Sequence, residues 1–186
     1  MEIVDAIGAV ETGEQDRPFT TDEAKELIHL LLQNVSFELP NHLIDYILQQ
    51  IDWLIPFYIQ SILDQIRNIH RDEELNKISK ATINKAILQM LEQRNHFEHW
   101  HKRIRESLQK DDYNFAKELL NVISENGTID SNEIFNLAVK YGLESTYKDL
   151  VNSLVYDGYI NNNDDHRIYR YNSPIVRMWW RKNVAN

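Results

Sequence analysis

The chain of 186 residues contains no cysteine, which excludes disulfide bonds, thiolate catalysis and Cys-ligated zinc sites. It has only 5 Gly and 4 Pro, so it offers few points for sharp turns and its composition favours long helices. No apolar run approaches the roughly 18 residues needed to cross a bilayer, and residues 1–17 lack the basic-then-apolar order of a signal peptide. We therefore expect a cytoplasmic protein that makes no use of a membrane.

Positive charge is also scarce, because 20 Lys and Arg residues stand against 29 Asp and Glu residues, for a net charge of −9. An acidic surface of this kind repels phosphate backbones and anionic lipid. Hydrophobic residues make up 42% of the chain and charged residues 26%, which is the balance of a folded globular protein.

Apolar residues recur at three- and four-residue spacing through most of the chain, which predicts a mainly α-helical fold. Thr20 or Thr21 can cap the first helix, and Pro56 can open the third after a break at 53–55. The helices expected in the N-terminal part span about 21–34, 41–51, 56–69, 80–94 and 96–110, with a loop at 70–79. We expect a flexible lead-in at 1–17, a helical bundle at 18–110 and a domain boundary at Asp111–Asp112.

Residues 111–186 change character, because short apolar segments alternate there with turn signals. Helices are expected at about 112–125, 131–142 and 145–157, with Asp130 or Ser131 and then Ser145 as N-caps. A short strand is expected at 128–130, a hairpin at 159–171 and a last helix after Ser173. Three helices followed by a hairpin predict a winged helix-turn-helix domain.

The densest group of possible metal ligands is formed by His96, Glu98, His99 and His101. His96 and His99 are three residues apart and could share a cation on one helix face, but His101 lies on another face and no H-E-x-x-H pattern occurs. The chain also lacks a G-x-S-x-G elbow, a glycine-rich phosphate loop and a paired-carboxylate motif. We expect no metal site and no catalytic residues.

A winged helix can bind DNA through basic residues on its third helix and its hairpin. Lys148 lies on that helix, and Arg167 and Arg170 lie in the hairpin. Arg177 and Arg181 give the last helix a basic face. These five residues are candidate contacts to nucleic acid or to a protein partner. Residues 112–186 nevertheless hold 8 Lys and Arg against 10 Asp and Glu, a net charge of −2, so DNA binding is expected to be weak.

The last helix carries two adjacent tryptophans, which point about 100° apart on a helix. Trp179 shares a face with Ile175 and Met178, so we expect it to be buried in the core. Trp180 is expected to be partly exposed or to lie at the domain junction.

Two stretches in the first half, PFTTDEAKELIHLL from Pro18 and WLIPFYIQSILDQI from Trp53, resemble the helical lid of AAA+/STAND-type ATPases of archaea and bacteria. The C-terminal run LVYDGYI…RIYRYNSPIVRMWW resembles the winged helix that closes many of these proteins. Trp53 and Leu54 stand where the family has a pair of small residues. The resemblance covers about residues 17–182 and leaves out the family's phosphate loop and its Mg²⁺-binding acidic strand.

The resemblance implies a non-catalytic C-terminal region of a larger ATPase, in which lid and winged helix transmit the nucleotide state and contact partners. It implies cofactor contacts at Pro56 and Tyr58 only when the missing ATPase core is present, so ATP and Mg²⁺ would belong to the full-length parent and this chain would bind no cofactor. The expected partner is an ATPase core or another protein. The alternative is a free-standing winged-helix transcriptional regulator that binds DNA and carries a helical sensor or dimerisation domain.

Overall fold

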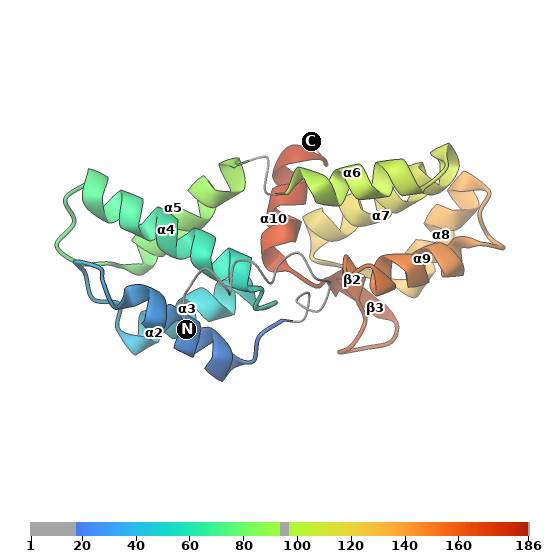
Figure 1. Ribbon diagram of the computed structural model, residues 1–186. Helices are drawn as coiled ribbons and strands as arrows, with labels where there is room; N and C mark the ends of the chain where they lie inside the picture. Colours follow the sequence, from blue (N-terminus) through green and yellow to red (C-terminus); the bar gives the residue numbers. More distant parts are fainter. Residues whose placement is uncertain (1–17, 94–96, 186) are drawn as a thin grey trace. The chain divides into compact units, whose positions relative to one another are not determined.

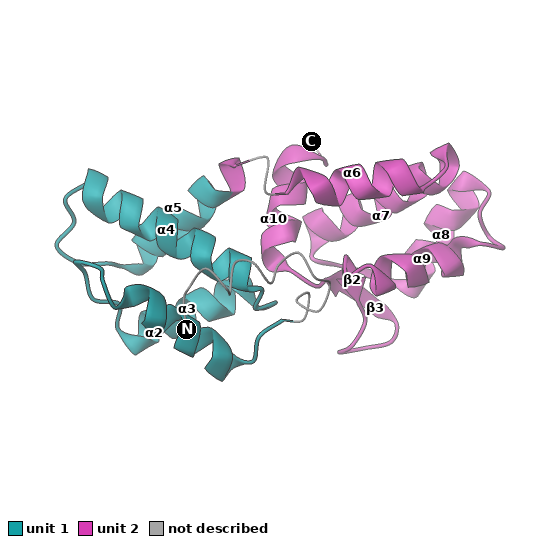
Figure 2. Ribbon diagram, in the orientation of Figure 1, with its two compact units in different colours: residues 1–90 teal, residues 91–186 magenta. Residues whose placement is uncertain are grey.

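The computed structural model describes residues 18–93 and 97–185, and the lead-in expected at 1–17 lies outside them (Figure 1). The chain divides into two compact units, residues 1–90 (unit 1) and 91–186 (unit 2) (Figure 2). Over the described residues the protein is mainly α-helical, with one small antiparallel sheet, as the apolar spacing predicts. None of the described helices is both long enough and apolar enough to cross a membrane.

The units divide earlier in the chain than the boundary expected at Asp111–Asp112. The helix before that pair, α6 (Glu98–Ser107), packs within unit 2. The hydroxyl of Tyr159 donates a hydrogen bond to the carbonyl of Trp100 in α6 (2.9 Å). Just before α6, the ring of Phe97 stacks on Trp179, with 5.8 Å between the centroids. These contacts join residues far apart in sequence, so local apolar spacing does not reveal them.

Unit 1 is built from helices whose starts agree with the sequence signals. They are α2 (Thr21–Leu32), α3 (Asn41–Ile51), α4 (Pro56–Asp72) and α5 (Lys80–Glu92). The last two residues of α5, 91 and 92, fall in unit 2 (Figure 2). Thr20 caps α2 in a reciprocal capping box with Glu23, and Pro56 takes the first position of α4. Two ends differ from expectation, because α2 stops at Leu32 and α4 continues to Asp72, into the predicted loop.

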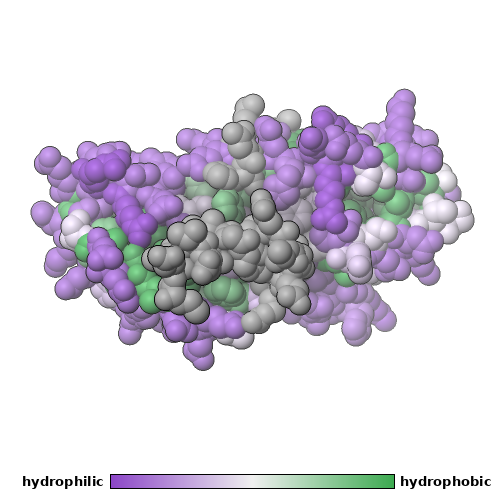
Figure 3. Space-filling view, viewed as in Figure 1, coloured by the Kyte–Doolittle hydropathy of each residue, from purple (hydrophilic) through white to green (hydrophobic). Residues whose placement is uncertain are grey.

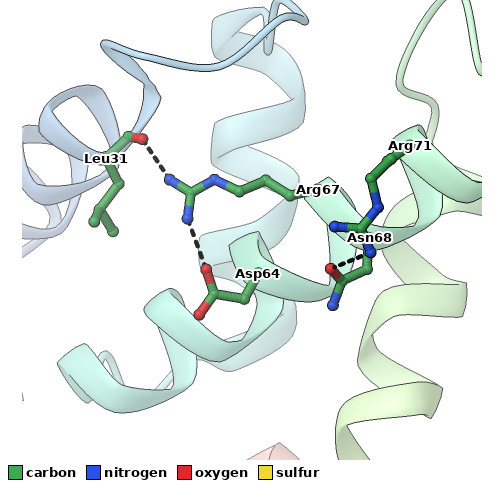
Figure 4. Close-up of polar contacts among 5 residues, drawn as sticks. All are labelled: Leu31, Asp64, Arg67, Asn68 and Arg71. Carbon is green, nitrogen blue, oxygen red and sulfur yellow. Dashed lines mark hydrogen bonds and ion pairs between the residues drawn. The ribbon is translucent and has the colours of Figure 1, made fainter.

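The core of unit 1 consists of aliphatic side chains at three- and four-residue spacing. Ile28, Ile47, Ile59 and Ile62 are each fully buried. A polar contact joins α4 to the end of α2, where the last carbonyls of a helix lack intrahelical partners. The guanidinium of Arg67 donates to the carbonyl of Leu31 and to the carboxylate of Asp64, the latter at 2.6 Å (Figure 4).

A tight connection links α3 to α4. Asp52 has a φ of 55°, and the amide of Trp53 donates to the carbonyl of Ile51 (2.7 Å), which together form a γ-turn. The amide of Phe19 donates to the carbonyl of Leu54 (2.9 Å), which fastens the segment before α2 to this connection. Non-glycine residues rarely adopt such a φ, so this connection carries backbone strain at Asp52, four residues before Pro56.

Unit 2 continues from α6 with helices and strands in alternation. They are α7 (Lys110–Asn126), β1 (Thr128–Asp130), α8 (Ser131–Tyr141), α9 (Tyr147–Tyr156), β2 (Ile160–Asn161), β3 (Ile168–Tyr171) and α10 (Pro174–Asn183). The strands form an antiparallel sheet in the order β1-β3-β2. The register places Ile129 opposite Tyr169 and Ile160 opposite Tyr171.

Most helix ends of unit 2 follow the predicted caps. Gly127 has a φ of 91° and Gly142 a left-handed φ of 69°, while Asp130 and Glu133 form a capping box at the start of α8. The predicted cap at Ser145 is wrong. A turn over residues 144–146 shifts the cap position to Thr146, whose side chain makes no capping hydrogen bond.

The expected burial of Trp179 is confirmed, and the expected partial exposure of Trp180 is wrong. Trp179 is 2% exposed, and Trp180 is completely buried. The reason is that α10 packs against both α7 and β3, so more than one of its faces is inside. The indole N–H of Trp180 donates to the side-chain oxygen of Asn121 in α7 (2.8 Å).

Candidate interaction surface

Helix α9 places one row of polar side chains outward and one apolar row inward. Val151 and Leu154 are buried, 4% and 3% exposed. The exposed residues define what we call the α9 surface: Lys148, Asp149, Asn152, Ser153 and Tyr156. Lys148, Asn152 and Tyr156 follow one another at four-residue spacing and therefore form a continuous row. Hydrophilic residues dominate the face drawn in Figure 3.

Tyr156 is the most exposed of the large hydrophobic residues that the structure describes. Its exposed fraction is 91%, although tyrosine normally buries much of its ring. It ends α9, immediately before the turn at Asp157 and Gly158. A nearly fully exposed aromatic side chain offers a large apolar contact area to a partner.

A pocket of about 350 Å³ lies beside the first half of α9. It is lined by Ser131, Ile134, Tyr147, Lys148, Val151, Asn152 and Tyr169. The hydroxyl of Ser131 donates to the carbonyl of Arg167 (3.0 Å), which fixes the start of α8 to the loop between β2 and β3. The polar groups of α9 thus border a pocket whose far wall is β3.

The charges around the α9 surface are mixed. Arg170 pairs with Asp164 at 2.9 Å, so the predicted base in β3 is already neutralised by an acid in the adjoining loop. Lys148 and Arg167 are exposed and form no ion pair with the described residues. Asp149 follows Lys148 in sequence, and Asp165 lies two residues before Arg167. The surface carries no continuous positive stripe of the kind that follows a phosphate backbone.

The two predicted arginines of α10 have different surroundings. Arg177 is partly buried, and its Nε donates to the carbonyl of Ser124 near the end of α7 (3.2 Å). Its guanidinium also lies beside Gly127, where an added Cβ would be 3.6 Å from the Nη1 atom. Arg177 therefore stabilises the C-terminus of α7, whereas Arg181 is exposed.

The two residues singled out for cofactor contact both belong to the start of α4 in unit 1. Pro56 occupies the first helical position, four residues after Asp52, the centre of the γ-turn. Tyr58 is 4% exposed, so its ring is part of the core of unit 1. Pro56 and Tyr58 belong to unit 1, whereas Lys148, Arg167 and Arg170 belong to unit 2.

Titratable side chains also cluster on the exterior of α7 and α8. Lys140 donates to both carboxylate oxygens of Glu118, at 2.7 and 2.8 Å, and the hydroxyl of Tyr141 donates to the same carboxylate. Burial acts to raise the pKa of Glu118, but the hydrogen bonds from Lys140 and Tyr141 outweigh it and hold that pKa below its ordinary value. The same carboxylate raises the pKa of Lys140 and of Tyr141. The three side chains satisfy one another's hydrogen-bonding groups, which fits a structural contact between α7 and α8.

The histidines that lie close together in sequence have different surroundings in the described part of the chain. His96 lies outside them, His99 packs against Trp100 with 5.3 Å between the ring centroids, and the Nε2 atom of His101 lies 2.9 Å from the hydroxyl of Tyr113. Among residues 18–93 and 97–185, no group of three or more His, Asp or Glu side chains could hold a metal ion.

Sequence reasoning missed Asn152 and Tyr156, which extend the row begun by Lys148. The four-residue spacing of these three positions was visible in the sequence. Lys148 is identified by its charge. The amide of Asn152 and the phenol of Tyr156 carry no formal charge, so a search for basic residues does not find them. The buried positions of α9, 151 and 154, are what identify the opposite row as the outward one.

No protein-family model matches the chain, and neither the curated proteins nor the solved structures yield a match.

Proposed function

We propose that the chain is the lid and winged-helix region of a larger AAA+/STAND-type ATPase and acts, without catalysing a reaction itself, through protein contacts of unit 2. The observation that carries the contact role is the exposure of Tyr156, 91%, on a helix surface of mixed charge. An exposed aromatic residue in such a row favours a protein partner, since interfaces concentrate their binding energy in Tyr, Trp and Arg.

The order of elements in unit 2 supports a winged helix. Helix α7, strand β1, helices α8 and α9 and the hairpin β2–β3 follow one another, and the hairpin pairs with β1 through β3. In this arrangement α9 takes the position of the recognition helix and the loop between β2 and β3 that of the wing. The α9 surface is then the face that such domains offer to partners.

The backbone before Pro56 supports the lid. The family carries a pair of small residues before this proline, and small residues permit backbone conformations that larger ones resist. In this chain Asp52 has a φ of 55° immediately before the corresponding positions, Trp53 and Leu54. A tight turn thus lies just ahead of these two positions, although both of their side chains are large.

Two experiments test the proposal. The first is to read the genomic DNA on both sides of the coding segment, where we expect a G-x-x-x-x-G-K-[ST] phosphate loop in the same or the adjacent reading frame. The second is to titrate that nucleotide-binding core with this chain by calorimetry, with ATP and then with ADP. We expect Tyr156→Ala to weaken binding by about 2 kcal/mol or more, as loss of a central aromatic contact does.

The control for Tyr156→Ala is Phe135→Ala, which removes another exposed aromatic ring from unit 2, on α8. It is expected to leave the affinity unchanged within about twofold, which is under 0.5 kcal/mol. If no phosphate-loop sequence lies nearby, or if the two variants weaken binding equally, the proposal is wrong.

A second candidate function is DNA binding by a free-standing regulator. Lys148 and Arg167 favour it, because both are exposed cations without an ion pair among the described residues and both lie where a winged helix meets DNA. Fluorescence anisotropy with a mixed duplex at physiological salt separates the two functions. Submicromolar affinity, lost in the double variant Lys148→Ala/Arg167→Ala, would establish the regulator instead of the ATPase region.

A further inference from the structure

Unit 2 contains a second pocket, on the side formed by α6 and α10. Its volume is about 400 Å³, within the range of small-ligand sites. It is lined by Glu98, His101, Lys102, Arg105, Trp179, Lys182, Asn183 and Val184. We call it the α6–α10 pocket. It lies apart from the α9 surface, with which it shares no residue.

Positive charge converges on the α6–α10 pocket although the chain as a whole is acidic. Three cations, Lys102, Arg105 and Lys182, line it against a single carboxylate, that of Glu98. Lys102 has Glu106 at 3.8 Å, a long ion pair, and Lys182 donates a hydrogen bond to the carboxylate of Glu92 at 3.2 Å; these side chains are exposed. Arg105 forms no ion pair with the described residues.

The pKa of His101 is lowered in this pocket wall. Burial lowers the pKa of its imidazole, and the charges of Arg105 and Lys117 lower it further. Its Nε2 atom is already engaged with the hydroxyl of Tyr113 at 2.9 Å. At neutral pH the ring is therefore an uncharged part of the wall, and the pocket's charge comes from the lysines and the arginine.

The wall also contains a hydrogen-bond donor that lacks an acceptor. Trp179 is 2% exposed, and its Nε1 atom is buried without a hydrogen-bond partner among the described residues. Its ring is held by stacking on Phe97. A buried N–H without an acceptor is uncommon in native proteins and calls for an explanation.

We propose that the α6–α10 pocket binds a small phosphate-bearing anion of the size of a diphosphate. Such an anion supplies acceptor oxygens to a wall whose charged groups are mostly donors, and it balances the excess of cations. Cations in the last turn of a helix stabilise that helix. Arg105 lies in the last turn of α6 and Lys182 in the last turn of α10, so this effect explains each residue separately. It does not account for their meeting in one cavity. This inference is independent of the proposed ATPase role.

The test is a titration of the full chain with sodium pyrophosphate at constant ionic strength, followed by ¹H–¹⁵N NMR of the four tryptophan indole groups. The variant Trp179→Phe assigns the Trp179 signal. We expect that signal to shift and to saturate at low millimolar pyrophosphate or below, an affinity of about 1 mM or tighter. Arg105→Glu and Lys182→Glu should each weaken binding at least about tenfold, because each replaces attraction by repulsion at the pocket wall.

The matched control is Arg181→Glu, which makes the same change of charge at the neighbouring position of α10 but outside the pocket lining. It should change the affinity by less than about threefold, since an exposed charge outside the pocket lining is screened by salt. Retained dispersion of the remaining indole signals shows that a variant is folded, and Arg105→Gln replaces Arg105→Glu if the latter fails this check.

A parallel titration with ADP identifies the source of the phosphate. Binding of pyrophosphate alone indicates a free diphosphate, and binding of both compounds indicates the diphosphate of a nucleotide. The proposal is overturned if pyrophosphate produces no saturable shift by 10 mM, or if Arg181→Glu weakens binding as much as Lys182→Glu. It is also overturned if duplex DNA binds more tightly at equal phosphate concentration and depends equally on Arg181, because that result describes a nucleic-acid surface.

Discussion

Trp180 donates its indole N–H to the side-chain oxygen of Asn121, at 2.8 Å, and this bond joins α10 to α7 inside unit 2. The two residues are 59 positions apart in the chain. Trp180 is completely buried, so its one polar atom needs a partner from another helix. The pairing shows that the last helix is a central element of unit 2.

Truncation of either tryptophan should destabilise unit 2 to a similar extent. We expect Trp179→Ala and Trp180→Ala each to lower the free energy of unfolding by about 3–5 kcal/mol, as large aromatic truncations in cores do. Urea melts followed by circular dichroism measure the losses. A loss for Trp180→Ala below about half that for Trp179→Ala would contradict the burial of Trp180.

The hydrogen bond to Asn121 can be tested apart from the ring. Trp180→Phe keeps an aromatic side chain but removes the donor, which leaves the oxygen of Asn121 without this partner. We expect it to cost about 1–3 kcal/mol for the unsatisfied group in addition to the lost volume. The double variant Trp180→Phe/Asn121→Leu should recover part of this loss, and simple additivity of the two single variants would count against the bond.

Local signals predicted the elements of this fold well because their causes are local. The capping box at Thr20, the start of α4 at Pro56 and the left-handed end of α8 at Gly142 all depend on residues within one turn of the chain. The unsuccessful prediction of a cap at Ser145 was also local, but there a turn competed with the cap, and sequence alone did not decide between them.

Features that depend on distant partners were not predictable in the same way. The apolar stripe of α10 indicated one inward face, yet α7 and β3 bury more than that face. Arg177 was singled out for its charge, but the charge is directed at the C-terminus of α7. Lys102, Arg105 and Lys182 were visible as basic residues, while their meeting at one pocket requires the packing of α6 and α10 within the unit.

Gly142 provides a test of backbone conformation at the end of α8. Its φ of 69° is left-handed, and an added Cβ would meet no atom within 4 Å. Gly142→Ala should therefore destabilise unit 2 by about 1–2 kcal/mol through the backbone alone, without a steric clash. Gly142→Asn should cost clearly less, because asparagine tolerates this conformation. Equal losses of stability for the two variants in thermal melts would show that the space around position 142, and not its φ angle, limits which residue fits there.

The ion pair of Glu118 with Lys140 should make stability depend on pH. The pKa of Glu118 is held below its ordinary value near 4.5, so the folded state gives up this proton more readily than the unfolded state. The resulting stabilisation is complete above pH 4.5 and disappears as the pH falls through the lowered pKa of the folded state. Because the pair is at the surface, we expect at most about 1 kcal/mol.

The variant Glu118→Gln isolates this contribution. Its destabilisation relative to the unchanged chain should be largest at pH 7 and should shrink below pH 4, in urea melts at each pH. The control is Glu125→Gln, on the same helix α7, whose exposed carboxylate forms no ion pair with the described residues. A loss for Glu118→Gln that is independent of pH would mean that packing, and not charge, explains the contact.

Arg67 should contribute to the stability of unit 1 more than its neighbour Arg71. Arg67 satisfies the carbonyl of Leu31 in the last turn of α2 and is held in place by Asp64 (Figure 4). The polar contacts of Arg71 with described residues are to Asn68 and Asp72, near its own position on α4. We expect Arg67→Met to cost about 1 kcal/mol, since it leaves a partly buried carbonyl without its donor. Arg71→Met, with a side chain that is 72% exposed, should change stability by less than about 0.5 kcal/mol.

Native-state hydrogen exchange measures both effects. Arg67→Met should speed exchange of the α2 amides and leave the α7 amides unchanged, because the lost bond lies in unit 1. Equal effects of the two variants on α2 would show that the bond to Leu31 does not stabilise the helix.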